Sequence, residues 1–174
     1  MGTNPGRTHR FYTGKAVVPF GYGLSFTTFT YAPSASAESV SLAPVHQMLK
    51  DTADEGHQFP SSQYLADAAP LVDYMVTVTN TGTVDADDVV LGFLVPPGAG
   101  VNGVPLQTLF GFERVHVPAG KSVTVNLYPS LADFTNTKLD GYKEAVAGDW
   151  TVKFGVKETA AHGQGYAEVK LTTY

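Results

Sequence analysis

Three aspartates, Asp85, Asp87 and Asp88, come closest to a catalytic carboxylate arrangement in this sequence. Hydrolysis between two carboxyl groups requires that they stand about 5–9.5 Å apart around a cleft of substrate size. These aspartates instead follow a turn at the expected start of a strand, where acidic side chains are commonly exposed. We therefore expect a solvated loop at this place, and we assign no catalytic residue to the chain.

The other residue types that could do chemistry form no recognisable site. Cysteine is absent, which excludes a thiol nucleophile, a thiolate metal site and a disulfide framework. Neither a Gly-x-Ser-x-Gly elbow nor a phosphate-binding Gly-Lys-Ser/Thr sequence occurs. No two of the five histidines stand at a spacing typical of metal ligands. They are His9, His46, His57, His116 and His162. We expect neither a metal nor a cofactor.

Carbohydrate binding is a chemistry that exposed aromatic side chains could support, because sugars stack on aromatic faces. Trp150 shares its strand parity with Val152 and Phe154, so we expect it to face the core, as a tryptophan does in immunoglobulin-like domains. Tyr12 and Tyr22 stand in a less regular segment and are candidates for exposure. Their alternative role is contact with a neighbouring domain.

The composition indicates one folded domain and excludes several classes of protein. The chain has 174 residues, 43% of them hydrophobic and 16% charged, which fits one domain with an extension. The net charge of −5 and the scattered basic residues argue against a nucleic-acid partner. No apolar run approaches the roughly 20 residues of a membrane helix, so we expect no membrane partner. The sequence shows no signal peptide.

The elements that would position these side chains are mainly strands. Alternation of apolar and polar residues, with turns rich in Gly and Pro, predicts seven strands at 40–42, 72–79, 89–95, 109–117, 122–128, 150–157 and 167–171. The pattern is typical of an all-β sandwich of fibronectin type III or immunoglobulin type, which we place at 37–174. Within it, we expect one or two helical turns at 44–50, a polar surface insertion at 51–70, irregular chain at 129–148 and a loop at 158–165. Between the two sheets we expect a core that includes Trp150, Phe154, Val76, Phe93 and Val125.

The first 36 residues differ from the rest, and we interpret them as an extended N-terminal arm. Seven aromatic residues stand among the first 31, interrupted by Gly and Pro. So much aromatic surface needs a cover. Since the seven strands account for most apolar faces, we expect the arm to dock on another domain or another copy of the chain, head to tail in the second case. The expected interface residues are Arg7, Arg10, Phe11, Tyr12, Phe20, Tyr22, Phe26 and Phe29.

Several stretches together resemble a known family. They include Val18-Pro-Phe-Gly-Tyr-Gly-Leu-Ser25, Val76-Thr-Val-Thr-Asn-Thr-Gly82, Leu109-Phe-Gly-Phe-Glu-Arg-Val115 and Ala147-Gly-Asp-Trp-Thr-Val152. In this order they are similar to the C-terminal domain of family 3 glycoside hydrolases and to the segment that joins it to the preceding domains, with the β-xylosidase branch most similar. The resemblance covers nearly the whole chain and implies a fibronectin type III-like sandwich behind a joining arm.

The resemblance also implies what this chain lacks. The enzymes of the family take a carboxylate nucleophile from a barrel domain and an acid/base carboxyl from the next domain, in a retaining mechanism. Since a barrel alone takes about 250 residues, neither domain is contained here. The resemblance therefore implies a module without activity of its own, taking part in carbohydrate metabolism as a piece of a secreted β-xylosidase or β-glucosidase. It would brace the catalytic domains or neighbouring subunits.

Two alternatives to the accessory module remain open from the sequence. One is a free-standing structural protein of a wall, sheath or filament that self-assembles through its arm. The other is a carbohydrate-binding module whose partner is a cell-wall polysaccharide. The extracellular location is implied by the resemblance alone.

Overall fold

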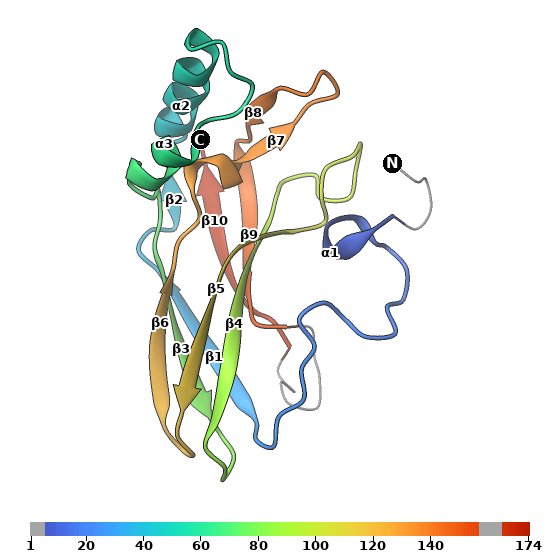
Figure 1. Cartoon of the computed structure of the whole chain (residues 1–174), viewed down its shortest axis with the longest axis vertical. Coiled ribbons are helices and arrows are strands. Elements are labelled where there is room, and N and C mark those ends of the chain that lie inside the picture. Colours follow the sequence, from blue (N-terminus) through green and yellow to red (C-terminus); the bar gives the residue numbers. More distant parts are fainter. Residues whose placement is uncertain (1–5, 157–164) are drawn as a thin grey trace.

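The computed structural model describes residues 6–156 and 165–174, and these form mainly strands (Figure 1). The helices are α1 (Thr8–Phe11), α2 (Ala43–Asp54), α3 (Ser62–Asp67) and the 3-10 helix η1 (Leu131–Phe134). The strands are β1 (Phe29–Ala35), β2 (Ser39–Val40), β3 (Tyr74–Asn80), β4 (Ala86–Val95), β5 (Thr108–Val117), β6 (Ser122–Leu127), β7 (Thr135–Thr137), β8 (Lys143–Ala145), β9 (Gly148–Phe154) and β10 (Ala167–Thr173). The expected loop at 158–165 lies, up to residue 164, outside the described residues, as does His162.

The strands form three sheets. A three-stranded sheet has the order β1-β3-β6, a five-stranded sheet has the order β2-β10-β9-β4-β5, and β7 pairs with β8. Neighbouring strands are antiparallel, apart from the short parallel pair of β2 with β10. The seven expected strands correspond to β2, β3, β4, β5, β6, β9 and β10, whereas β1, β7 and β8 were not expected.

The main core joins the three-stranded sheet to the five-stranded sheet. Tyr74 of β3 packs against Phe154 of β9, with ring centroids 5.3 Å apart, and against Phe110 of β5 at 6.1 Å. Trp150 is 2% exposed and meets Phe134 edge to face at 5.5 Å. The expected burial of Trp150, Phe154, Val76 and Val125 in this core is confirmed.

Phe93 is buried but belongs to a second cluster, so its expected place between the sheets is wrong. It groups with Leu91 and Val156, whereas Val90 and Leu94 of the same strand belong to the main core. Side chains alternate across a strand, so β4 buries apolar groups on both of its faces. The five-stranded sheet therefore has an apolar outer face that needs a cover of its own.

The segment between β2 and β3 is more ordered than the expected surface insertion at 51–70. Helix α2 extends to Asp54 and buries Val45, Met48 and Thr52. These residues stand three and four positions apart, which places them on one face of a helix. The Thr52 hydroxyl donates to the Met48 carbonyl at 2.7 Å. The region 129–148 is likewise not wholly irregular, since it contains η1, β7 and β8.

The arm is shorter than expected, because β1 begins at Phe29. Phe29 is 2% exposed and Tyr31 is 4% exposed, both in the main core. The strand pairs with β3 at the edge of its sheet, where Pro33 is tolerated because an edge strand has one unpaired side. We use the name arm below for residues 6–28. No helix of the described part is long and apolar enough to cross a bilayer.

Candidate functional site

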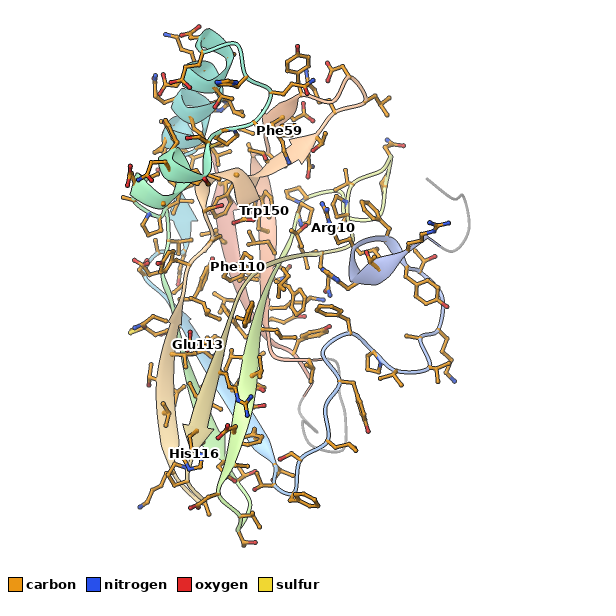
Figure 2. The ribbon with its side chains drawn as sticks, in the orientation of Figure 1. Arg10, Phe59, Phe110, Glu113, His116 and Trp150 are labelled. Carbon is orange, nitrogen blue, oxygen red and sulfur yellow. The ribbon has the colours of Figure 1, made fainter. Side chains whose placement is uncertain are left out.

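The arm folds back on the outer face of the five-stranded sheet, beside β4 (Figure 1). The His9 ring lies 4.2 Å from the Phe20 ring and 5.8 Å from the ring of Phe93 on β4. The Leu106 amide donates to the Arg10 carbonyl at 2.7 Å, and Arg10 lies on the side of α1 that faces the sheets (Figure 2). The expectation that little surface remains for folding back is therefore wrong, because β4 is apolar on both faces.

The surroundings of His9 in this contact favour the neutral form of its ring. Its Nε2 atom is buried and has no hydrogen-bond partner. Desolvation, and then the charge of Arg10, lower the pKa of His9 below its usual 6.5. Protonation of His9 therefore opposes docking. The docked arm is favoured above pH 6.5, the usual pKa of histidine, and it is weakened as the pH falls through the lowered pKa of docked His9.

The two further anchors of the arm lie at Gly21 and Thr27. Gly21 has a φ of +81°, and a Cβ there would stand 2.5 Å from Leu91 Cδ1 and 2.8 Å from Val156 Cγ1. The Thr27 hydroxyl donates to Asn80 Oδ1 at 2.6 Å in a buried contact. The arm is thus fixed at its beginning, its middle and its end.

Between the anchors, the arm exposes large apolar side chains, and we call this set the apolar ledge. It consists of Val17 (100% exposed), Val18 (59%), Leu24 (89%) and Phe26 (95%). These four side chains gather on one anchored segment, and large exposed apolar surface is rare on a monomer, so we treat the segment as a candidate interaction surface.

The structure divides the eight expected interface residues into three groups. Tyr22 and Phe26 are exposed, and Phe20 is 46% exposed although it packs on His9. Near α1 lie Arg7, Arg10, Phe11 and Tyr12, with the Arg10 guanidinium 5.4 Å from the centre of the Phe11 ring. Phe29 is buried in the core, so its assignment to an interface is wrong.

Two interface candidates were missed by the sequence reasoning. Val17 and Leu24 are among the most exposed apolar side chains of the described residues. Their signal in the sequence is an aliphatic residue in a segment rich in Gly and Pro that has neither helix nor strand period. Because such a residue belongs to neither a helix nor a strand, no repeating pattern places it on a buried face.

The three aspartates do not form the expected solvated loop, because Asp87 and Asp88 belong to β4. Asp88 is 8% exposed and accepts a hydrogen bond from the Tyr31 hydroxyl at 2.5 Å. Burial, followed by the charge and hydrogen bond of Asp88, raises the pKa of Tyr31. Asp85 accepts from the Ala119 amide at 2.8 Å.

Asp87 lies on the outer face of the sheet in a small ionic cluster. It accepts from Arg114 Nη2 at 2.8 Å and contacts His116 Nδ1 at 2.8 Å. The hydrogen bonds from His116 and Arg114 lower the pKa of Asp87, so it stays ionised and is unsuited to act as a general acid. Among the described residues, no group of three or more His, Asp or Glu side chains could hold a metal ion.

The proteins of similar sequence include plant and fungal xylosidases. No family model matches the chain. It is 40% identical over 130 residues to β-D-xylosidase 1 of Arabidopsis thaliana, which covers 72% of this chain and 17% of the plant protein. It is 34% identical over 174 residues to a probable exo-1,4-β-xylosidase of Aspergillus clavatus, over 99% of this chain and 20% of the fungal protein. The chain thus spans about a fifth of the length of its relatives.

Solved structures give a matching fold. A β-glucosidase from Erythrobacter marinus superposes with a TM-score of 0.65 at 23% identity, over 97% of this chain and 18% of that one. A β-glucosidase from Listeria innocua in complex with isofagomine gives 0.63 at 17% identity, over 99% of this chain and 20% of that one. At these identities the likeness concerns the fold alone.

Proposed function

We propose that this chain, which is homologous to about 20% of the length of family 3 β-xylosidases and β-glucosidases, serves as their C-terminal, non-catalytic accessory module. In this proposal the module braces the catalytic domains of a longer enzyme and takes part in carbohydrate metabolism through that enzyme. A secreted location belongs to the same proposal and is supported by the fungal and plant xylosidases among its relatives.

A fibronectin type III-like sandwich is the fold that we assign to this module. The support is the shared core, in which Tyr74 of the three-stranded sheet packs on Phe154 of the five-stranded sheet. We place the sandwich at residues 29–174, with β1 included, and the joining arm before it. The region between α2 and β3 then lies beside one end of the sandwich.

The observation that carries the proposal is the apolar ledge. The backbone that carries these side chains is anchored at His9 and Phe20 and at Thr27. A partner that covers such a surface gains apolar burial without having to order the chain that carries it. The relatives supply such a partner, because about four fifths of their length lies outside the matched segment.

The first test places this chain in a full-length enzyme. We expect a chimaera of the Aspergillus clavatus protein, in which this chain replaces the matched segment, to lose thermal stability when Leu24 and Phe26 are changed to serine. Burial of a large apolar side chain contributes about 1.5–3 kcal/mol. In the isolated chain both side chains are exposed, so the same changes should move its melting temperature by at most a few degrees. Differential scanning fluorimetry of both proteins measures the difference.

Leu139→Ser is the matched control, because Leu139 is fully exposed and lies in the turn between β7 and β8. It should leave both proteins unchanged. The accessory role is contradicted if the arm variants leave the chimaera unchanged while they convert an oligomer of the isolated chain into monomers in light scattering. The ledge would then join copies of the chain. Point substitutions suit this test better than removal of residues 1–31, which would cut into β1.

The second test concerns activity. We expect the isolated chain to show no turnover of aryl β-xylosides or aryl β-glucosides, because Asp87 and Asp88 are engaged by Arg114 and Tyr31. The measurement is release of the aryl group over a day at high protein concentration. Turnover that persists through purification and disappears in Asp87→Asn or Asp88→Asn would contradict the proposal.

A further inference from the structure

We propose that the hollow between the arm and the outer face of β4 and β5 binds a single neutral pyranose sugar unit. Arm residues 21–25 form one wall, Val89, Leu91 and Val156 form the floor, and Asp87 and Arg114 stand at the edge. Its volume of about 380 Å³ lies at the lower end of the range of small-molecule sites. This inference does not depend on the accessory role, because every residue of the hollow belongs to this chain.

The hollow is preformed. Gly21 brings the arm backbone against Leu91 and Val156 so closely that a side chain at this position would not fit. Gly23, two residues further on, has no atom within 4 Å of the place of a Cβ, so open space lies beside the arm at this position. The change from close contact to open space within two residues creates the wall, and the anchor at Thr27 keeps it in place.

The surfaces of the hollow suit a ligand with one apolar face. Tyr22 on the wall is 42% exposed, and Val89 on the floor is 39% exposed. A pyranose ring carries C–H groups on its faces and hydroxyls around its rim. An aromatic ring beside a small apolar floor offers the contact that such C–H faces need.

The polar edge suits hydroxyl groups. Asp87 and Arg114 are joined by two hydrogen bonds, from Nε at 3.1 Å and from Nη2 at 2.8 Å, and His116 holds the other carboxylate oxygen. The pair therefore presents an acceptor and a donor in fixed positions at the rim. A sugar hydroxyl both donates and accepts, so it can bond to both members of the pair.

The charges favour a neutral ligand over an ion. Asp87 is paired with Arg114, and the buried Asp88 accepts a hydrogen bond from the Tyr31 hydroxyl, so a bound ion would have to displace one of these partners. The topology also argues against a bound peptide strand. β4 is flanked by β9 and β5 and has no free edge on which a strand could be added.

The test is an amide-shift titration of the isolated chain by nuclear magnetic resonance. D-Xylose, D-glucose and methyl β-D-xyloside should shift the amides of residues 21–25 and 89–91 in a saturable way, with Kd on the order of 1 mM. D-Glucuronate, the anionic probe, should bind at least threefold more weakly. Tighter binding of glucuronate would overturn the neutral-sugar assignment, and the absence of saturable shifts at these amides would overturn the site.

Variants locate the site within the molecule. Tyr22→Ala and Arg114→Gln should each weaken xylose binding by about tenfold, whereas Tyr12→Ala should leave it unchanged. Tyr12 is a matched control, since it is a 37% exposed tyrosine of the same arm that does not line the hollow. If Tyr22→Ala loses its dispersed amide spectrum and is therefore unfolded, Tyr22→Leu replaces it in the titration, because leucine keeps an apolar group on the arm. Unchanged affinity in the folded Tyr22 variant contradicts the proposal.

Discussion

Replacement of Trp150 by alanine should lower the free energy of unfolding by about 3–5 kcal/mol, which is the range for large aromatic residues removed from a core. The side chain is 2% exposed and contacts Phe134 edge to face. Its Nε1 atom donates to the Val146 carbonyl and to the Thr173 hydroxyl, both at 3.2 Å. Alanine loses the packing and leaves both acceptors with one bond fewer. A loss of this size is a large part of the stability of an ordinary domain.

Equilibrium unfolding in urea, followed by circular dichroism, measures this effect. Trp150→Phe should cost less, because it keeps an aromatic ring near Phe134 and loses only part of the buried volume together with the two hydrogen bonds. Tyr128→Ala is the control, since Tyr128 is 60% exposed and should change the unfolding midpoint little. If Trp150→Ala unfolded at the same urea concentration as the parent, the burial of Trp150 and the strand parity that predicts it would both be wrong.

The strands that were predicted share a physical property, which is burial on one face or on both. In β3 and β9 the buried side chains alternate with more exposed ones, as the sequence pattern indicates. In β4 the run of apolar residues predicts a central strand, and the strand lies between β9 and β5. Burial of this kind follows from the order of apolar and polar residues along the strand, so a local sequence pattern predicts it.

The elements that were missed depend on partners distant in sequence. β1 contains Pro33 and follows a segment rich in Gly, and its identity as a strand comes from pairing with β3, whose residues lie 39 to 51 positions further along the chain. Helix α2 was expected only as one or two turns at 44–50, and its continuation to Asp54 was missed. It buries only one narrow face, through Val45, Met48 and Thr52, among polar neighbours. A short stripe that ends in a threonine is weak evidence for a helix.

The candidate site was predictable in its residue types but not in its arrangement. The sequence indicates that aromatic residues of the arm need a cover, and Tyr22 and Phe26 are exposed as that reasoning requires. The arm docks on the outer face of β4 because Leu91 and Phe93 place apolar groups there. That face exists only once β4 is assembled between β9 and β5, so a local sequence pattern does not reveal it. For the same reason the pairing of Asp87 with Arg114 could not be read locally, since it follows from the register of β4 with β5.

The second large effect is expected at Asn80, whose replacement by alanine should cost about 2–4 kcal/mol of stability. The side chain is fully buried at the end of β3. Its Nδ2 atom donates to the carbonyls of Val84 at 2.8 Å and Val117 at 2.9 Å. Its Oδ1 atom accepts from the Gly82 amide at 3.1 Å and from the Thr27 hydroxyl at 2.6 Å. One amide thus ties the arm, the turn after β3 and the end of β5 together.

Alanine at position 80 leaves these groups buried without a partner, which costs more than the lost bonds alone. Urea unfolding measures the loss, and hydrogen exchange of the arm amides should rise at the same time, because the Thr27 anchor is gone. Asn126→Ala is the matched control, since Asn126 is an exposed asparagine of β6 and its replacement should stay within about 0.5 kcal/mol. Thr27→Val separates the two effects, because it removes only the arm contact and should destabilise less than Asn80→Ala. Equal losses in Asn80→Ala and Asn126→Ala would mean that the buried network at Asn80 does not hold the arm in solution.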